Sequence, residues 1–190
     1  MDNDVIIAHL RARCPTFAQR VAGAAEYAAA RESTALAVPF AFVIPVDDEP
    51  EPNAAENGIS QRLVETFGVV VAVSNATDER GQASAKAIHQ VRAELWAALL
   101  GWRPTPQHGL IAYEGGNLLG LDRARMWWQF EFSTDFYIDD SDGWLQAQQQ
   151  ALPRFEGADI KVDVIDPIAQ PRPGPDGRTE FEAQVNNLPE

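Results

Sequence analysis

Residues 59–73 read ISQRLVETFGVVVAV and residues 125–138 read RMWWQFEFSTDFYI, and these two stretches decide the fold. In the first stretch, apolar side chains recur with the two-residue period of a β-strand at Ile59, Leu63, Phe67, Val69, Val71 and Val73. Its second half is apolar on both faces, so we expect it to lie inside a sheet. In the second stretch, one face is bulky and apolar, at Met126, Trp128, Phe130, Phe132, Phe136 and Ile138.

The opposite face of residues 125–138 is polar, and we expect it to face solvent. It carries Arg125, Gln129, Glu131, Ser133 and Asp135, with two large aromatic side chains, Trp127 and Tyr137, among them. Exposed aromatic residues are enriched at protein interfaces, so both are candidate contact residues. The alternative is that a helix or the C-terminal segment of the same chain covers this face.

The remaining patterns predict the order of the elements. Helical periodicity marks residues 4–10 and 15–28, and a proline-bounded apolar run at 38–45 predicts a strand at the boundary of the sheet. A helix is expected over 78–100, with one side formed by Ser84, Ile88, Val91, Leu95, Ala98 and Leu99. A strand at 109–113 then precedes residues 125–138. The order helix, strand, strand, helix, strand, strand indicates an α+β fold, with a mixed or antiparallel sheet and helices packed on one face.

Length and composition indicate one main domain. The chain has 190 residues, 45% of them hydrophobic, which is enough for one sizeable core. We therefore predict a single α/β domain over residues 1–166, including a helix-like piece at 144–152 and a strand at 158–165. A proline- and glycine-rich linker then makes residues 167–190 a C-terminal arm. Its β-like patch around Phe181 and Val185 would fray in a monomer, or add to a neighbour's sheet in an assembly.

Charge and cysteine content narrow the function classes. With 15 basic against 28 acidic side chains, the formal net charge is −13. Such a field repels phosphate backbones, which argues against nucleic-acid binding. The single cysteine, Cys14, cannot form an internal disulfide, as is typical of a reducing compartment. The sequence has no apolar run of membrane-spanning length, and its acidic start is unlike a signal peptide, so we expect synthesis in the cytoplasm.

The sequence contains no motif that predicts catalysis. His9, His89 and His108 lie far apart and in no metal-binding spacing, and no nucleophile elbow or phosphate-binding loop is present. An EF-hand in which Gly143 filled the sixth position would place its first ligand at Ile138, so that interpretation fails. A looser cation site at Asp139, Asp140 and Asp142 stays open beside a solvated hairpin end. We predict no catalytic, cofactor-binding or metal-binding residue, and no cofactor.

Residues 46–58, VDDEPEPNAAENG, predict an exposed acidic loop. Its carboxylates, Asp47, Asp48, Glu49 and Glu51, could be interpreted as a general acid and base. However, no apolar pocket is at hand to separate their pKa values. Solvated charge is the better interpretation.

Several of these segments together resemble a known family. They are the strand VPFAFVIP at 38–45, GISQR at 58–62, FGVVVAV at 67–73 and the helix start DERG at 78–81. Over residues 35–138 the chain is similar to the tail terminator proteins of long-tailed bacteriophages, in particular the branch of Mu-like and related siphophages. The resemblance implies an α/β fold with the same order of elements.

The resemblance also implies a structural, non-enzymatic role. Such proteins form a ring, typically a hexamer, on the last ring of the tail-tube protein. The ring stops tube polymerisation and offers its other surface to the connector of the head. This chain would then be assembled in the host cytoplasm and reside at the head-proximal end of the virion tail. DNA would pass through the lumen without specific binding.

From exposure and lack of internal partners, the candidate contact residues are Asp47, Asp48, Glu49, Glu51, Trp127, Tyr137, Phe181 and Val185. One alternative is another head-tail joining or completion protein of the same particle. The other is a small ligand-binding or enzymatic α/β domain, which would need a pocket with convergent polar groups.

Overall fold

The computed structural model describes residues 2–33, 35–75, 83–152, 157–163, 177, 179 and 181–186. The chain divides into two compact units, residues 1–143 and residues 144–190. The predicted domain boundary after residue 166 lies outside the described residues and remains a prediction.

The first unit is built on a five-stranded sheet with the order β1-β2-β3-β5-β4. The short β1 pairs in parallel with β2, and all other neighbours are antiparallel. The mixed sheet and its helices confirm the predicted α+β class. The strands are β1 (Val21–Ala22), β2 (Phe40–Pro50), β3 (Ser60–Ser74), β4 (Ala112–Leu121) and β5 (Arg125–Asp139).

Strand β3 is the centre of this sheet. It pairs with β5 over its whole length, from Ser60 opposite Asp139 to Ser74 opposite Arg125, and with β2 on its other edge. Residues from Phe67 to Val73 are buried on both faces. This confirms that the apolar half of residues 59–73 lies inside the sheet.

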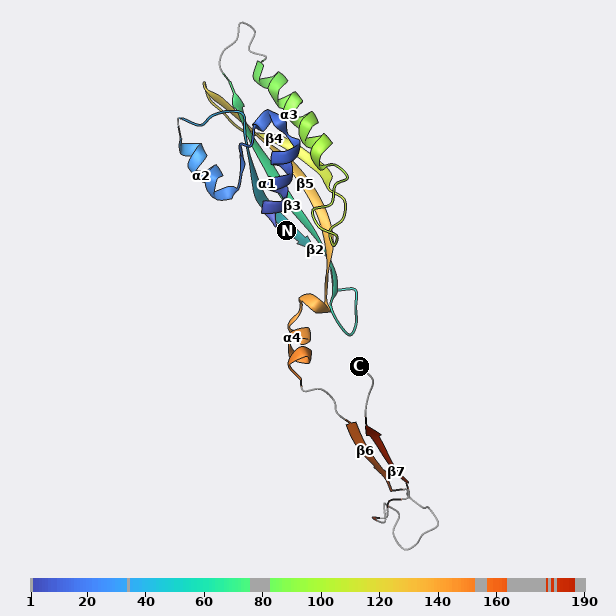
Figure 1. Ribbon diagram of the computed structural model, residues 1–190. Helices are drawn as coiled ribbons and strands as arrows, with labels where there is room; N and C mark the ends of the chain where they lie inside the picture. Colours follow the sequence, from blue (N-terminus) through green and yellow to red (C-terminus); the bar gives the residue numbers. More distant parts are fainter. Residues whose placement is uncertain are drawn as a thin grey trace. The chain divides into compact units, whose positions relative to one another are not determined.

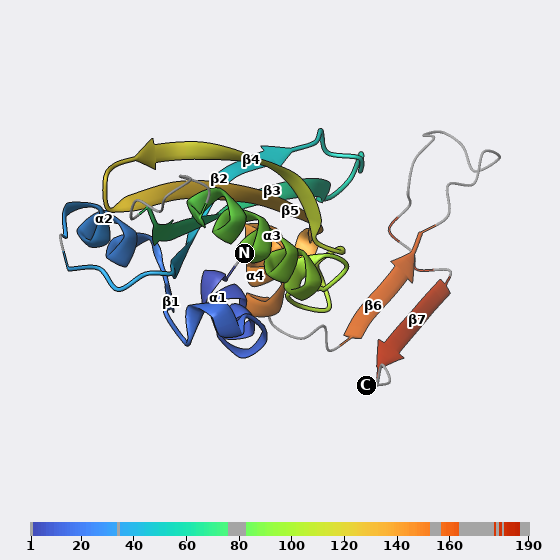
Figure 2. The same ribbon diagram turned by 90° about the horizontal axis from the view of Figure 1, so that it is seen from above.

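Two helices, α1 (Asn3–Arg13) and α3 (Ala83–Leu99), pack on one face of the sheet (Figures 1 and 2). We call this the helical face. The buried residues of α3 are the ones that its periodicity predicted: Ser84, Ile88, Val91, Leu95, Ala98 and Leu99. Below them lie the alternating side chains Phe67, Val69, Val71 and Val73 of β3 and Phe130 and Phe132 of β5.

A second, smaller core lies on the opposite face, under α2 (Ala24–Glu32). Here Tyr27 and Ala30 of α2 pack with Phe42 of β2, Val70 of β3 and Trp127 of β5. The sequence predicted that all helices pack on one face of the sheet. That prediction is wrong for α2, which packs on the opposite face. The reason is that β3 carries Val70 and Ala72 on this face, and these also need cover.

Two segments differ from the sequence-based prediction. The expected helix over residues 15–28 is divided, because Ala18 and Gln19 adopt positive φ angles of 45° and 70° after the 3-10 turn η1 (Pro15–Phe17). Strand β1 follows, and α2 begins only at Ala24. Likewise β2 continues through Pro50, so the loop expected from residue 46 begins later, because β3 offers pairing partners as far as Leu63.

Smaller differences concern helix and strand ends. The N-cap of α1 is Asp2, which accepts the N–H of Asp4, so the helix begins just before the predicted residues 4–10. The expected start of α3 at residue 78 lies outside the described residues. Strand β4 extends well past the predicted 109–113, and the register shift between Tyr113 and Gly115 shows a bulge at Glu114.

The second unit contains helix α4 (Trp144–Ala151) and two strands, β6 (Gly157–Val162) and β7 (Phe181–Asn186). The two strands pair antiparallel over six positions. We call this pair the C-terminal ribbon. The β-like patch of the arm is thus a strand, and within the chain its partner is β6.

The surroundings of Cys14 predict an unreactive thiol. Cys14 is fully buried in the core below α1, and burial, followed by the Glu94 carboxylate, raises the pKa of its thiol to about 12. Because the thiolate is the reactive species, we expect negligible labelling of the native protein by a thiol reagent at pH 8 and rapid labelling in denaturant. Cys14 is the only cysteine, so the label reports on it alone.

The control is Ser141→Cys, which adds an exposed thiol to the same chain. In this variant the added thiol should react at once under native conditions. The Cys14 thiol should remain unlabelled until denaturant is added. Equal labelling rates of Cys14 in native and denaturing buffer would show that this core is open.

Candidate functional site

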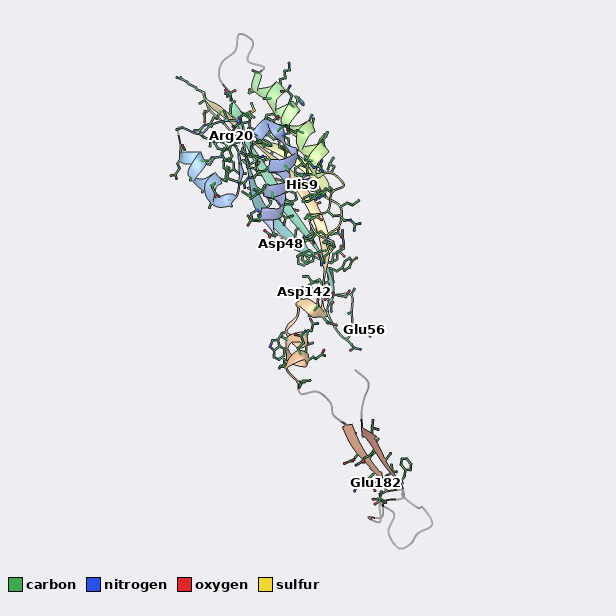
Figure 3. All side chains as sticks on the ribbon, viewed as in Figure 1. His9, Arg20, Asp48, Glu56, Asp142 and Glu182 are labelled. Carbon is green, nitrogen blue, oxygen red and sulfur yellow. The ribbon has the colours of Figure 1, made fainter. Side chains whose placement is uncertain are left out.

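The acidic end of the first unit is an ordered turn. The loop after β2 meets the 3-10 helix η2 (Asp140–Asp142), where the Asp140 carboxylate accepts the N–H of Ile59 at 2.7 Å. Asp139 accepts hydrogen bonds from the hydroxyl of Ser141 and from its N–H, the latter at 2.7 Å, and these two bonds lower the pKa of Asp139. Figure 3 shows Glu56 and Asp142 at this end. The carboxylates considered for a loose cation site therefore serve as acceptors for backbone N–H groups.

Beyond α2, the face opposite the helical face is acidic. Residues of β3 on this face alternate from Val70 through Thr66 and Val64 to Arg62, and their cross-strand partners share the face. We call this surface the acidic face. Its carboxylates include Asp47 and Glu49 on β2, Glu131 and Asp135 on β5, and Glu114 on β4, which accepts a hydrogen bond from the Ser133 hydroxyl.

One arginine bridges the strands of the acidic face. Arg62 on β3 contacts Glu51 at 2.6 Å and Asp135 at 2.9 Å. The hydrogen bonds to Asp135 and then Glu51 raise the pKa of the guanidinium above its ordinary value. All three side chains are partly solvated, so the bridge orders the surface more than it stabilises the fold. Carboxylates remain in excess on the acidic face.

A less exposed polar contact, between His108 and Glu65, lies on the helical face at the same end of the sheet as Arg62. His108 Nε2 is 3.2 Å from Glu65 Oε2, and His108 Nδ1 is 2.7 Å from the hydroxyl of Thr105. The neighbouring Gly109 donates its N–H to the carbonyl of Asp135 at 2.6 Å. These contacts hold residues 105–109, which precede β4, against the sheet. Sequence reasoning missed them, although Glu65 interrupts an apolar face of the predicted strand.

The other histidines have structural partners. His9 stacks on Trp102 and contacts the carbonyl oxygen of Ala98 at 2.9 Å, and His89 accepts a hydrogen bond from Arg92 at 2.8 Å. Among the described residues, no group of three or more His, Cys, Asp or Glu side chains could hold a metal ion. In the same part of the chain, no helix is long and apolar enough to span a membrane.

The structure separates the four predicted acidic contact residues. Asp47, Asp48 and Glu49 lie on the exposed extension of β2, and Glu51 begins the loop. Asp47 and Glu49 belong to the acidic face, whereas Asp48 pairs with Glu65 and points to the helical side. A cleft elsewhere is lined, among the described residues, by side chains that do not titrate: Thr16, Val38, Pro39, Val73, Ser74, Ala83, Ala87, Gln90 and Val91.

The two aromatic candidates differ in exposure. Trp127 is only 4% exposed, because α2 covers it and its ring contacts Tyr27 and Phe42. The expectation that Trp127 is exposed is wrong, and the alternative of cover by a helix of the same chain is confirmed. Tyr137 is 61% exposed beside Arg62 on the acidic face, so its role as a contact residue stays a prediction.

The remaining candidates, Phe181 and Val185, lie on the C-terminal ribbon. Apolar residues face each other across it: Ala158 and Val185, Ile160 and Ala183, Val162 and Phe181. These six side chains form one face, and charged or amide side chains form the other. Phe181 and Val185 are exposed on the apolar face.

The described chain thus combines a well-packed α+β core with two surfaces suited to protein contacts, an acidic sheet face and an amphipathic ribbon. This is the construction of a structural assembly protein. The family model for the phage tail terminator protein matches residues 1–142, so the chain belongs to the phage tail terminator family. It is a structural component of the virion tail and not an enzyme. No curated protein matches the chain.

The contrast between the two aromatic residues can be tested by mutation. Trp127→Ala removes a buried ring and should lower the free energy of unfolding by about 3–5 kcal/mol. Tyr137→Ala changes an exposed side chain and should alter it by no more than about 0.5 kcal/mol. Urea denaturation of both variants measures the difference, and equal effects would contradict the cover by α2.

Proposed function

We propose that this chain forms a closed ring, typically a hexamer, that caps the tail tube. The ring stops tube polymerisation and provides the docking surface for the head connector. Membership of the tail terminator family is the observation that carries the proposal. A ring requires two different surfaces on each copy that fit one another, and the chain offers several exposed candidates.

Termination further requires the two ends of the ring to differ. One end must make the contacts that a tube ring makes, and the other must offer none to a further tube ring. The ordered acidic end formed by the loop after β2 and η2 is a distinctive surface of this kind. Its hydrogen bonds to Asp139 and Asp140 hold it in one conformation.

The acidic face suits the lumen of such a ring. Asp47, Glu49, Glu131 and Asp135 lie on one sheet face beyond α2, and Arg62 compensates only part of their charge. Carboxylates repel DNA phosphates, so the duplex can slide past without adhering. In this arrangement the helical face points outward, and Tyr137 lies beside the passage.

Loss of the protein should change tail length. Phage lacking the gene should produce overlong, headless tails, because nothing stops tube polymerisation. Electron microscopy of lysates measures the length distribution, and wild-type protein supplied in trans should restore it. Tails of normal length that fail to join heads would contradict the terminator role and indicate a head-tail joining protein instead.

The lumen assignment can be tested by a matched pair of charge reversals. Glu49→Lys changes the acidic face, whereas Asp48→Lys changes the neighbouring residue on the other side of the strand. Purified Glu49→Lys rings should retain duplex DNA at low salt and release it as salt rises. Asp48→Lys rings should behave like the wild type, and equal DNA retention by both variants would contradict the assignment.

A further inference from the structure

Within the second unit, no described residue covers the apolar face of the C-terminal ribbon. Ile160, Val162, Phe181 and Val185 are all exposed on it. A two-stranded sheet on its own is at best marginally stable in water. The ribbon also lies beyond residues 1–142, which match the family, so it is an addition to the part that the family shares.

The five-stranded sheet has two outer edges, and they differ. The edge of β2 is occupied at one end by β1, while its other end carries Pro45, Pro50 and three carboxylates. Proline and charge are the devices by which proteins protect sheet edges from further pairing. In contrast, β4 is ten residues long, contains no proline, and has one charged residue, Glu114. Its outer edge is the better acceptor for another strand.

The side chains of β4 fit the ribbon as well. Leu118 and Leu121 are 48% and 58% exposed, and they pair with Trp128 and Met126 on the helical face. A ribbon strand added beside β4 would bring its apolar face next to these leucines and continue the helical face. A six-residue strand spans roughly 20 Å, less than the roughly 33 Å of β4, so the ribbon fits within the available edge.

We propose that the C-terminal ribbon of one copy adds to the free edge of β4 in a second copy, which extends the sheet from subunit to subunit. The inference rests on the proposed ring and names one of its contacts. Donor and acceptor are different surfaces of the same chain, so the contact is heterologous and can close into a ring. The added strand supplies main-chain hydrogen bonds, and the apolar contacts of Phe181 and Val185 supply affinity.

Thiol cross-linking between two differently tagged, co-expressed variants tests the contact. Both carry Cys14→Ala; one adds Asn117→Cys on β4, and the other adds Asp159→Cys on β6 or Gln184→Cys on β7. With a short bis-maleimide we expect a covalent dimer carrying both tags. Neither variant expressed alone should give this product. The control variant carries Asp48→Cys on the β2 edge in place of Asn117→Cys, and it should give no mixed dimer.

The outcomes separate the two proposals. If light scattering shows rings but no mixed dimer forms, the ribbon contact is overturned and the ring stands. If the protein is monomeric both alone and with tube protein, the ring itself fails, and the ribbon contact fails with it. A third variant carries both cysteines in one chain and is expressed with an excess of cysteine-free protein. An internally cross-linked monomer would show that the ribbon adds to its own β4, which also overturns the proposal.

A charge substitution provides an independent measurement. Leu118→Lys places a charge in the proposed contact and should weaken association by at least about tenfold. Leu100→Lys replaces another exposed leucine, at the end of α3 and outside β4, and should leave association unchanged. Equal effects of the two substitutions would overturn the proposed contact. Circular dichroism of both variants verifies that the fold is retained.

Discussion

The pairing of β3 with β5 is the constraint on which the rest of the first unit depends. Both strands are 15 residues long and remain in register from end to end. A slip of one residue would exchange the two faces of a strand, placing Phe132 and Phe130 under α2 and polar side chains under α3. The bulk of the side chains facing α1 and α3 makes such a slip costly. The register therefore also decides which residues face solvent at the far end of the sheet.

This register explains why one sheet face is half core and half acidic. Near α2 the face presents Val70, Ala72 and Trp127, which need cover and receive it. α2 has only nine residues and reaches only part of the strands. Beyond it the same alternation brings Glu49 and Asp135 to the surface beside Val64. A short helix over a long sheet thus produces a charged surface held on rigid strands, which is better defined than a charged loop.

The sequence predicted the elements whose periodicity is long and one-sided. The apolar side of α3 and the alternation of β5 could be foreseen, because each is a local pattern repeated over several turns or strand positions. The position of α2, the pairing of Val21 in β1 and the extension of β2 through Pro50 could not, because each depends on a partner distant in sequence. Trp127 is the clearest example of what local patterns do not predict. The alternation of β5 correctly placed it on the side opposite the helical face, but its burial depends on the packing of α2.

The two units differ in how far they bury their apolar side chains. The first buries its largest side chains, Phe67 and Phe132 among them, within its own core. The second places its apolar side chains on one face of a two-stranded ribbon and on α4, where Trp144 and Leu145 are exposed. A helix of eight residues and a pair of six-residue strands are each too small to be stable in isolation. Burial of these apolar side chains against a further surface would therefore stabilise the second unit.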